Sequence, residues 1–312
     1  MSKSILLTGS TGFVGSALLK RLLMQDDMKI KVVVRHSIVL ENVFCLEVDD
    51  INAATDYSSV IHDTETVIHC AARAHIMDDS AADPLSAFRA VNTEGTLNLA
   101  LQAAQAGVKR FIFLSSIGVN GISSMTPFSV SDTPAPIEDY AVSKLEAEVG
   151  LRKIAAETGM EVVIIRPPLV YGPNAPGNFG KLAKLASRNL PLPFGAIHNK
   201  HSLVALDNLV DLMIICIDNS NAANQTFLVS DDHDVSTTEL LCMIVCASGK
   251  APRLIPVPVS WLKLVGKFTG KQTVIDRLCS SLQVDIRYTK NVLGWSPPVS
   301  FKDGIFKCFE SD

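Results

Sequence analysis

The sequence predicts an α/β protein built on a doubly wound, parallel β-sheet with helices on both faces. Short apolar runs alternate with segments of helical period, and 47% hydrophobic residues in a chain of 312 suffice for a large core. The runs expected to form strands cover 4–8, 30–35, 43–48, 66–71, 110–115 and 161–166, and the helical patterns cover roughly 13–25, 85–106 and 138–157.

The first apolar run ends at Thr8 and leads into a glycine-rich turn, Gly9-x2-Gly12-x2-Gly15, which opens the first helical pattern. Glycines in this place let backbone N–H groups approach a pyrophosphate, which then lies at the positive end of the helix. A tight turn without a ligand is the alternative. Strand, glycines and helix nevertheless occur in the order that a dinucleotide site needs, so the sequence predicts a dinucleotide cofactor here.

Residues that follow the other runs are further cofactor candidates, because ligands bind such sheets beyond the carboxyl ends of the strands. Arg35 follows the second run. An arginine there suits the 2′-phosphate of NADP, whereas an acidic residue would suit the ribose of NAD, and an exposed arginine without a ligand is the alternative. Asp50 can accept from the adenine amino group, and the small Ala71 and Ala72 let a cofactor lie against backbone.

Tyr140 and Lys144 are one helical turn apart in the pattern 138–157 and share a face. A nearby ammonium lowers the pKa of a phenol from its usual value of about 10, so that the tyrosine can exchange a proton with a sugar or steroid hydroxyl. Alone, this spacing is that of many surface pairs. Ser115 and Ser116, which end the run 110–115, offer a hydroxyl to the same substrate oxygen, although serines there also cap or turn the chain.

Several other polar residues have structural interpretations. His69 is expected to be a packed histidine, and Asn92 is expected to lie inside a helix and bond a neighbouring strand. Cys242 and Cys246 share a helix face, but no histidine or cysteine pair elsewhere completes a zinc site. We therefore expect packed thiols and no metal.

Composition and charge argue against whole classes of protein. A net charge of −4 without basic clusters argues against nucleic-acid binding, and no apolar run has the length of a membrane span. Seven cysteines without paired spacing, and no signal peptide before the first strand, predict a reducing cytoplasm.

The motifs together resemble the extended short-chain dehydrogenase/reductases, and within them the nucleotide-sugar epimerase/dehydratase group. The resemblance rests on the glycine turn, Ser116, Tyr140-x3-Lys144 and the stretch Arg166–Pro173, and it covers essentially the whole chain. It implies a Rossmann-like NAD(P)-binding domain over 1–167, to which segments at about 202–230 return. It also implies a smaller C-terminal α/β portion over 168–312 that binds the nucleotide sugar.

The resemblance also implies roles for individual residues. Tyr140 would be the acid/base, Lys144 would hold the nicotinamide ribose while lowering the tyrosine pKa, and Ser116 rather than Ser115 would be the catalytic hydroxyl. The cofactor contacts it implies are Gly9, Thr11, Gly12, Phe13, Val14, Gly15, Arg35, Asp50, Ile51, Ala71, Ala72, Tyr140, Lys144 and Pro167.

Three residues are expected on the substrate side. Asn178 lies where the family has an asparagine against the nucleotide diphosphate, although a helix N-cap would suit it equally. Lys200 stands in place of a family arginine that grips the diphosphate and offers a point charge without bidentate geometry. Arg277 is a second candidate anchor. The resemblance also implies a homodimer that pairs through the helices 85–106 and 138–157.

The reaction stays open between alternatives. Family dehydratases have an Asp-Glu pair after the catalytic hydroxyl, and Ile117-Gly118 here argue against a 4,6-dehydratase. Arg35 favours NADP and hence a 4-keto reductase of a UDP-linked deoxyhexose for surface polysaccharide. A UDP-glucose or UDP-N-acetylglucosamine 4-epimerase with tightly bound NAD is the alternative, and a non-catalytic NADP-sensing regulator is a second one. The segments 71–77 and 178–195 resemble a bacterial subgroup that contains both epimerase-like and quinovosamine-forming enzymes, and do not separate the two reactions.

Overall fold

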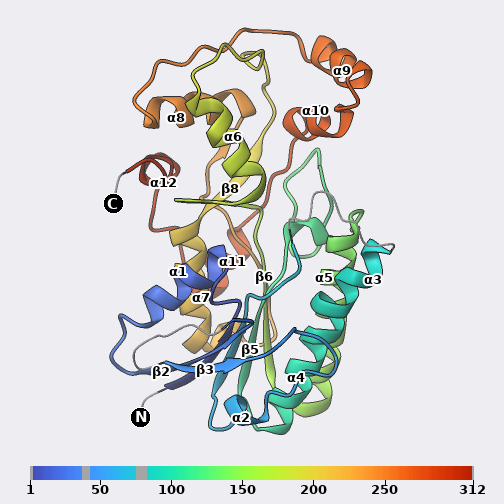
Figure 1. Ribbon diagram of the computed structural model, residues 1–312, viewed down its shortest axis with the longest axis vertical. Helices are drawn as coiled ribbons and strands as arrows, with labels where there is room; N and C mark the ends of the chain where they lie inside the picture. Colours follow the sequence, from blue (N-terminus) through green and yellow to red (C-terminus); the bar gives the residue numbers. More distant parts are fainter. Residues whose placement is uncertain (1–2, 37–42, 75–82, 311–312) are drawn as a thin grey trace.

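A seven-stranded parallel sheet forms the larger part of the protein, whose computed structural model describes residues 3–36, 43–74 and 83–310 (Figure 1). The strand order is β3-β2-β1-β4-β5-β6-β9. All six expected strands are present within two residues of their expected ends, so the predicted fold class is confirmed. The strands are β1 (Lys3–Thr8), β2 (Met28–Val34), β3 (Phe44–Glu47), β4 (Thr66–His69), β5 (Arg110–Leu114), β6 (Glu161–Arg166) and β9 (Thr226–Leu228).

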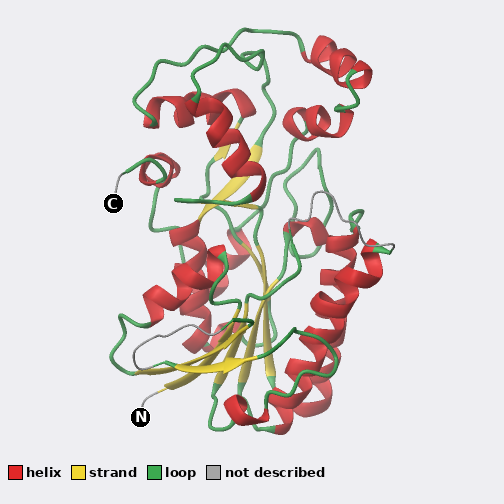
Figure 2. Cartoon of the chain, in the orientation of Figure 1, coloured by secondary structure: helices red, strands yellow, loops and turns green. Residues whose placement is uncertain are grey.

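Two layers of helices cover the sheet (Figure 2). Helices α1 (Phe13–Leu22) and α7 (Leu206–Asp218) pack on one face, and α4 (Thr96–Gln105) and α5 (Asp139–Thr158) pack on the other. Side chains alternate along the buried strands, so Phe111 joins the core under α4 and α5 whereas Ile112 joins the core under α7.

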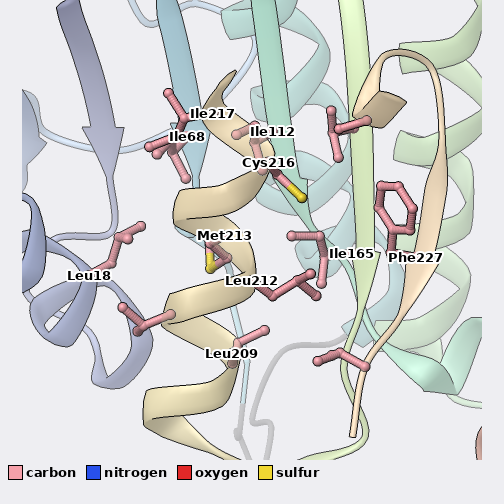
Figure 3. Packing of buried hydrophobic residues seen from close by; sticks show 14 of the residues in the cluster. Leu18, Ile68, Ile112, Ile165, Leu209, Leu212, Met213, Cys216, Ile217 and Phe227 are labelled. Atoms are coloured by element: carbon pink, nitrogen blue, oxygen red, sulfur yellow. The ribbon is translucent and has the colours of Figure 1, made fainter. Parts of the chain in front are cut away.

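Helix α7 shows why this layer is stable. Leu209, Leu212, Met213 and Cys216 recur at helical spacing, and all are fully buried. Figure 3 shows them directed at strand residues such as Ile165. Each buried leucine or methionine of this kind contributes about 1.5–3 kcal/mol relative to exposure, so the helix is held by its apolar face.

The predicted single helix over 85–106 is wrong. The chain there forms α3 (Pro84–Phe88), a π-helical segment (Arg89–Gly95) and then α4. The extra residue of a π-turn turns Asn92 inward, where its amide bonds the backbone of Arg73 at 2.8 and 3.1 Å and the hydroxyl of Ser143 at 3.0 Å. Asn92 thus has the structural role expected of it, with the segment after β4 as its partner.

A second, smaller unit of structure follows β6, and the sequence predicts its presence but not its individual helices and strands. Its sheet has the order β10-β8-β7 and lies beside α6, α8 and α12 (Figure 1). The chain returns from it to the large sheet through α7 and β9, whereas β8 stays in the small sheet. The division at residue 167 stays a prediction. The elements of this smaller unit are β7 (Leu169–Tyr171), α6 (Gly177–Ser187), β8 (His201–Ala205), β10 (Asp234–Val235), α8 (Thr237–Ala247), α9 (Val259–Phe268), α10 (Gln272–Cys279) and α12 (Phe301–Lys307). Helix α11 (Arg287–Leu293) packs against β9 and joins the core of the large sheet.

Polar contacts with buried partners hold the segments that follow β9 against earlier parts of the chain. The hydroxyl of Tyr171 donates to Asp231 at 2.7 Å, and the indole of the buried Trp295 donates to Asp211 of α7 at 2.9 Å. The tryptophan is therefore a packing residue. Among the described residues, no helix combines the length and the apolar character that crossing a membrane requires.

Candidate active site

The carboxyl ends of four adjacent strands, β1, β4, β5 and β6, bring the predicted site residues to one edge of the sheet. Gly9 follows β1, Ala71 lies two residues beyond β4, Ser115 follows β5 and Pro167 follows β6. The strand order reverses between β1 and β4, because the chain runs outward to β3 before it returns. Ligands of doubly wound sheets bind at such a reversal.

The glycine turn at this reversal leaves room for backbone and nothing else. Gly9 has φ +73°, and a Cβ there would lie 2.6 Å from the amide nitrogen of Ala71. A Cβ at Gly15 would lie 2.0 Å from the carbonyl oxygen of Gly9. The turn is therefore the tight cradle that a dinucleotide needs.

Helix α1 begins at this turn without a side-chain cap. Gly12 is its N-cap and makes no side-chain hydrogen bond, so the first N–H groups of α1 are open to an anion. A cavity of about 530 Å³ opens beside them, between the turn and the loop that follows β7. Its lining includes Thr11, Gly12, Phe13, Pro173 and Asn174. These features fit the pyrophosphate of a nicotinamide dinucleotide.

Replacing Gly15 by alanine should abolish tight cofactor binding. The new methyl group cannot fit 2.0 Å from a backbone oxygen, so α1 must move away from the turn, at a cost of about 1–3 kcal/mol. Cofactor content per protein and the urea midpoint measure both effects. Gly12→Ala is the graded comparison, because its Cβ would lie 3.3 Å from the same oxygen and should cost less. Full cofactor content and an unchanged midpoint in Gly15→Ala would contradict this interpretation.

The remaining predicted cofactor residues lie around the same edge. Arg35 is exposed immediately after β2, and Asp50 is exposed while one of its carboxylate oxygens accepts from the amide of Ile51 at 2.8 Å. Ile51 is buried, Ala71 and Ala72 are half-buried, and the buried Pro167 accepts at its carbonyl from Ile117. Val14 packs against the core as part of α1. In the stretch 71–77, residues 75–77 lie outside the described residues.

His69 is the packed histidine that the sequence predicted. Its ring is fully buried, bonds the hydroxyl groups of Thr8 at 2.7 Å and Thr96 at 2.9 Å, and stacks on Phe113. Burial, and secondarily the charge of Lys144, lower its pKa to about 3. It therefore ties β4 to β1 and α4 in its neutral form.

Tyr140 lies in the first turn of α5, beside the segment that follows β5. The short 3₁₀ helix Ile117–Val119 packs there so closely that a Cβ at Gly118 would lie 3.2 Å from the Cβ of Ala141 and 3.3 Å from the hydroxyl of Ser116. The tyrosine ring is half-buried and meets Phe88 edge-to-face, with centroids 6.0 Å apart. The fold thus packs the segment that begins at Ser116 against the first turn of α5, and the shared substrate oxygen stays a prediction.

Lys144 is fully buried and is held by the strand end rather than by the phenol. Its Nζ donates to the carbonyl oxygen of Leu114 at 2.9 Å, lies 4.4 Å from the ring centroid of Phe113, and is 6.0 Å from the centroid of Tyr140. The expected lowering of the tyrosine pKa is therefore wrong for this arrangement. Burial raises the pKa of Tyr140 to about 12, and burial lowers the pKa of Lys144 to about 8.

The buried ammonium of Lys144 should make stability depend on pH. Its pKa is about 8 in the folded chain against 10.5 in the unfolded chain, so the burial cost is complete below pH 8 and disappears as pH rises to 10.5. Between these values, wild-type protein should gain about 3 kcal/mol relative to Lys144→Met. The lost bond to Leu114 adds only a pH-independent offset. Urea unfolding of cofactor-free protein measures the difference.

The matched control for this pH series is Lys153→Met, which removes an exposed lysine from the same helix. Its stability difference from wild type should stay nearly constant from pH 8 to 10.5. A constant difference for Lys144→Met as well would contradict the buried charge.

A buried ionic cluster, which the sequence reasoning missed, separates the roles of the two serines. Ser115 is buried, and its hydroxyl donates to Glu148 at 2.6 Å. Glu148 is fully buried and binds Arg166 through two bonds of 2.9 and 2.5 Å, while Arg166 also donates to Asn120 at 2.9 Å. Ser115 is therefore a structural residue. The half-exposed Ser116 accepts from the amide of Gly118 at 3.1 Å and so caps the 3₁₀ helix, the alternative considered for it, and its catalytic role stays a prediction.

The three predicted substrate residues are all exposed, and their roles stay predictions. Asn178 is not a helix N-cap, because α6 begins at Gly177 with Pro176 at the N-cap. Lys200 directly precedes β8, where its backbone pairs with the segment of Ser281 and Leu282. Arg277 forms an ion pair with Glu138, two residues before Tyr140, so it lies near the site but already has an acidic partner.

Comparison with known proteins finds similar sequences and structures over most of the chain. A sequence profile described as the NAD dependent epimerase/dehydratase family matches residues 5–230. A UDP-glucose 4-epimerase of Vibrio cholerae is 52% identical over 308 residues, which cover 98% of this chain and 94% of that protein.

Solved structures show the same fold. A UDP-glucuronic acid 4-epimerase of Bacillus cereus in complex with NAD superposes with a TM-score of 0.80 at 20% identity, covering 98% of this chain and 97% of that one. A UDP-glucose 4-epimerase of Thermotoga maritima with UDP-glucose gives 0.78 at 23% identity, covering 98% and 97%.

Proposed function

Because the chain belongs to the NAD dependent epimerase/dehydratase family, we propose that it is a UDP-hexose 4-epimerase that keeps NAD tightly bound. The observation that carries the proposal is the 52% identity to a UDP-glucose 4-epimerase over nearly the full length of both chains. The 4-keto reductase favoured from the sequence has less support, since it depended on Arg35 as a sign of NADP. The NAD dependent family and the 52% identical 4-epimerase favour NAD instead.

The residues at the sheet edge have the chemistry that epimerisation needs. Bound NAD would take a hydride from the sugar carbon and return it, so no cofactor is consumed. Tyr140 would remove the proton of the 4-hydroxyl group and later give it back. Ser116 would hold the same oxygen, and Lys144 would fix the cofactor ribose and supply positive charge. Inversion at one carbon requires that the sugar ring present both of its faces to the cofactor in turn. The protein must therefore hold the substrate by its nucleotide, and this is the role proposed for Asn178 and Lys200.

Cofactor release and turnover without added cofactor test the proposal. Denatured protein should release one NAD per chain, and native protein should interconvert UDP-glucose and UDP-galactose with nothing added. Release of NADP, or turnover of a 4-keto sugar only when NADPH is supplied, would favour the reductase. Cofactor binding without turnover on any UDP- or dTDP-sugar would favour the regulator. UDP-N-acetylhexosamines belong in the same panel.

The cofactor preference has its own test at Arg35. Under the proposal, Arg35→Asp should still be purified with NAD, because the wild-type side chain has no 2′-phosphate to bind. A wild-type protein that carries NADP and an Arg35→Asp variant that carries NAD would instead support the reductase.

We also propose that the protein is a cytoplasmic homodimer that serves polysaccharide biosynthesis. Support for the dimer comes from α4 and α5, which pack on each other and expose Leu101 and Val149. Sedimentation of wild-type protein and of Val149→Lys tests it, and a wild-type monomer at micromolar concentration would exclude it.

A further inference from the structure

Helix α9 presents an apolar stripe to solvent. Trp261, Leu264, Val265 and Phe268 are 68%, 56%, 58% and 82% exposed. Their spacing of i, i+3, i+4 and i+7 places them on one face of the ten-residue helix. A stripe with this spacing normally faces a core, so an exposed one indicates a surface for contact with something else.

The opposite side of α9 is already occupied. Leu262 is buried, and Gly266 lies against α10, where a Cβ would come within 2.9 Å of the Ile275 side chain. This close packing fixes the orientation of α9 on α10. The apolar stripe therefore faces outward as part of the folded structure.

The chain segment that contains the stripe is basic in sequence. The stretch 250–275 contains five basic residues and no acidic residue, although the whole chain has a net charge of −4. Lys263 lies 3.9 Å from Asp276, an ion pair at the edge of this region. The basic residues are Lys250, Arg253, Lys263, Lys267 and Lys271.

We propose that α9 docks on an anionic lipid bilayer, lying in the interface with its apolar stripe among the upper acyl chains. Aromatic and aliphatic side chains on one face, with lysines flanking them, are the features that hold a short helix at this boundary. The side chains of Lys267 and Lys271 would lie against lipid phosphates. Helix α9 lies at one end of the long axis of the protein, away from the large sheet, where a flat surface can reach it (Figure 1).

A single convex helix favours a lipid surface over a folded protein partner. Four side chains on ten residues offer far less than the roughly 800 Å² per partner of a stable protein interface. A bilayer needs no matching groove, because lipids rearrange around the side chains. This surface is separate from the sheet edge, so docking does not depend on the proposed catalytic activity.

Sedimentation with vesicles tests the proposal. The full chain should bind phosphatidylcholine vesicles that contain phosphatidylglycerol, and binding should weaken at high salt and on neutral vesicles. Trp261→Ser/Phe268→Ser and Lys267→Glu/Lys271→Glu should each weaken binding by about tenfold or more. The matched control is Phe44→Ser, which removes another exposed phenyl group, from strand β3, and should bind like wild type.

Tryptophan fluorescence locates the contact. Trp295 is 2% exposed, so only Trp261 should shift its emission to shorter wavelength when vesicles are added. Trp261→Phe should lose the shift and keep most of the binding. No binding to anionic vesicles would overturn the proposal, as would equal binding by the double serine variant. Self-association that the double serine variant abolishes, without vesicle binding, would assign the stripe to a contact between copies of the chain. Turnover of UDP-sugar should be unchanged in every variant.

Discussion

Tyr140→Phe should lower kcat by about 10²–10⁴-fold under the proposed function, because it removes the phenol proposed to exchange a proton with the sugar. The rest of the ring is retained, so its contact with Phe88 should persist and the unfolding midpoint should change little. The bound cofactor should also remain, since the substitution leaves the glycine turn intact. Turnover of UDP-glucose and released NAD, measured on the same preparation, separate lost chemistry from lost cofactor.

The control for this experiment removes a tyrosine hydroxyl elsewhere. Tyr288→Phe loses a hydroxyl that donates to Gln225 at 2.5 Å, away from the sheet edge, and should keep full activity. Ser116→Ala should reduce kcat with intact folding, whereas Ser115→Ala should mainly reduce stability, because only Ser115 bonds Glu148. Full turnover by Tyr140→Phe would disprove the catalytic assignment.

Glu148→Ala should destabilise the protein by about 3–5 kcal/mol, the largest effect on stability that we expect. The substitution leaves the buried guanidinium of Arg166 without its carboxylate, and an unpaired buried charge is far costlier than the pair was worth. It also frees the hydroxyl of Ser115 and loosens the strand end that holds Lys144. The urea concentration at the midpoint of unfolding and the activity at 25 °C should therefore both decrease.

Glu146→Ala is the matched control for this prediction. Glu146 lies two residues away on the same helix and pairs with Arg89, but both side chains are more than one-third exposed. Its loss should cost about 1 kcal/mol or less. Equal costs for the two variants would show that burial does not govern the strength of this ionic cluster.

The large sheet could be predicted from sequence because its strands are buried on both faces. Runs such as 111–114 are continuously apolar, and no solvent-exposed face dilutes the signal. The glycine turn could be predicted from the sequence as well, because a close approach of two backbone segments requires glycine in any protein.

The small sheet and the π-helical segment left no such signal. Strands of two or three residues, such as β7 and β10, are too short to show a period. The π-turn depends on Asn92 reaching Arg73 and Ser143, contacts that exist only after folding. Glu148 follows Lys144 at i+4 and so shares its face, but a glutamate on a helix is normally expected in solvent. Its burial depends on Arg166, which arrives from a different element.

Likewise, the pair of Tyr140 and Lys144 was found from spacing, but its electrostatics were not. The sequence shows that the two side chains share a helix face, whereas the pKa of each side chain depends on how much water the fold removes from it. Here burial dominates, and the ammonium is directed to the carbonyl of Leu114. The direction of a pKa shift therefore needs the three-dimensional structure.

The late return of α7 and β9 to the large sheet has a consequence for synthesis of the chain. A ribosome that has just completed residue 167 has made six of the seven strands, yet the edge of β6 has no neighbour and one sheet face lacks α7. Such a nascent chain exposes an unpaired strand and apolar surface, both of which invite aggregation. Until Leu228 has emerged and paired with Arg166, the nascent chain should either be bound by a chaperone or collapse only very slowly.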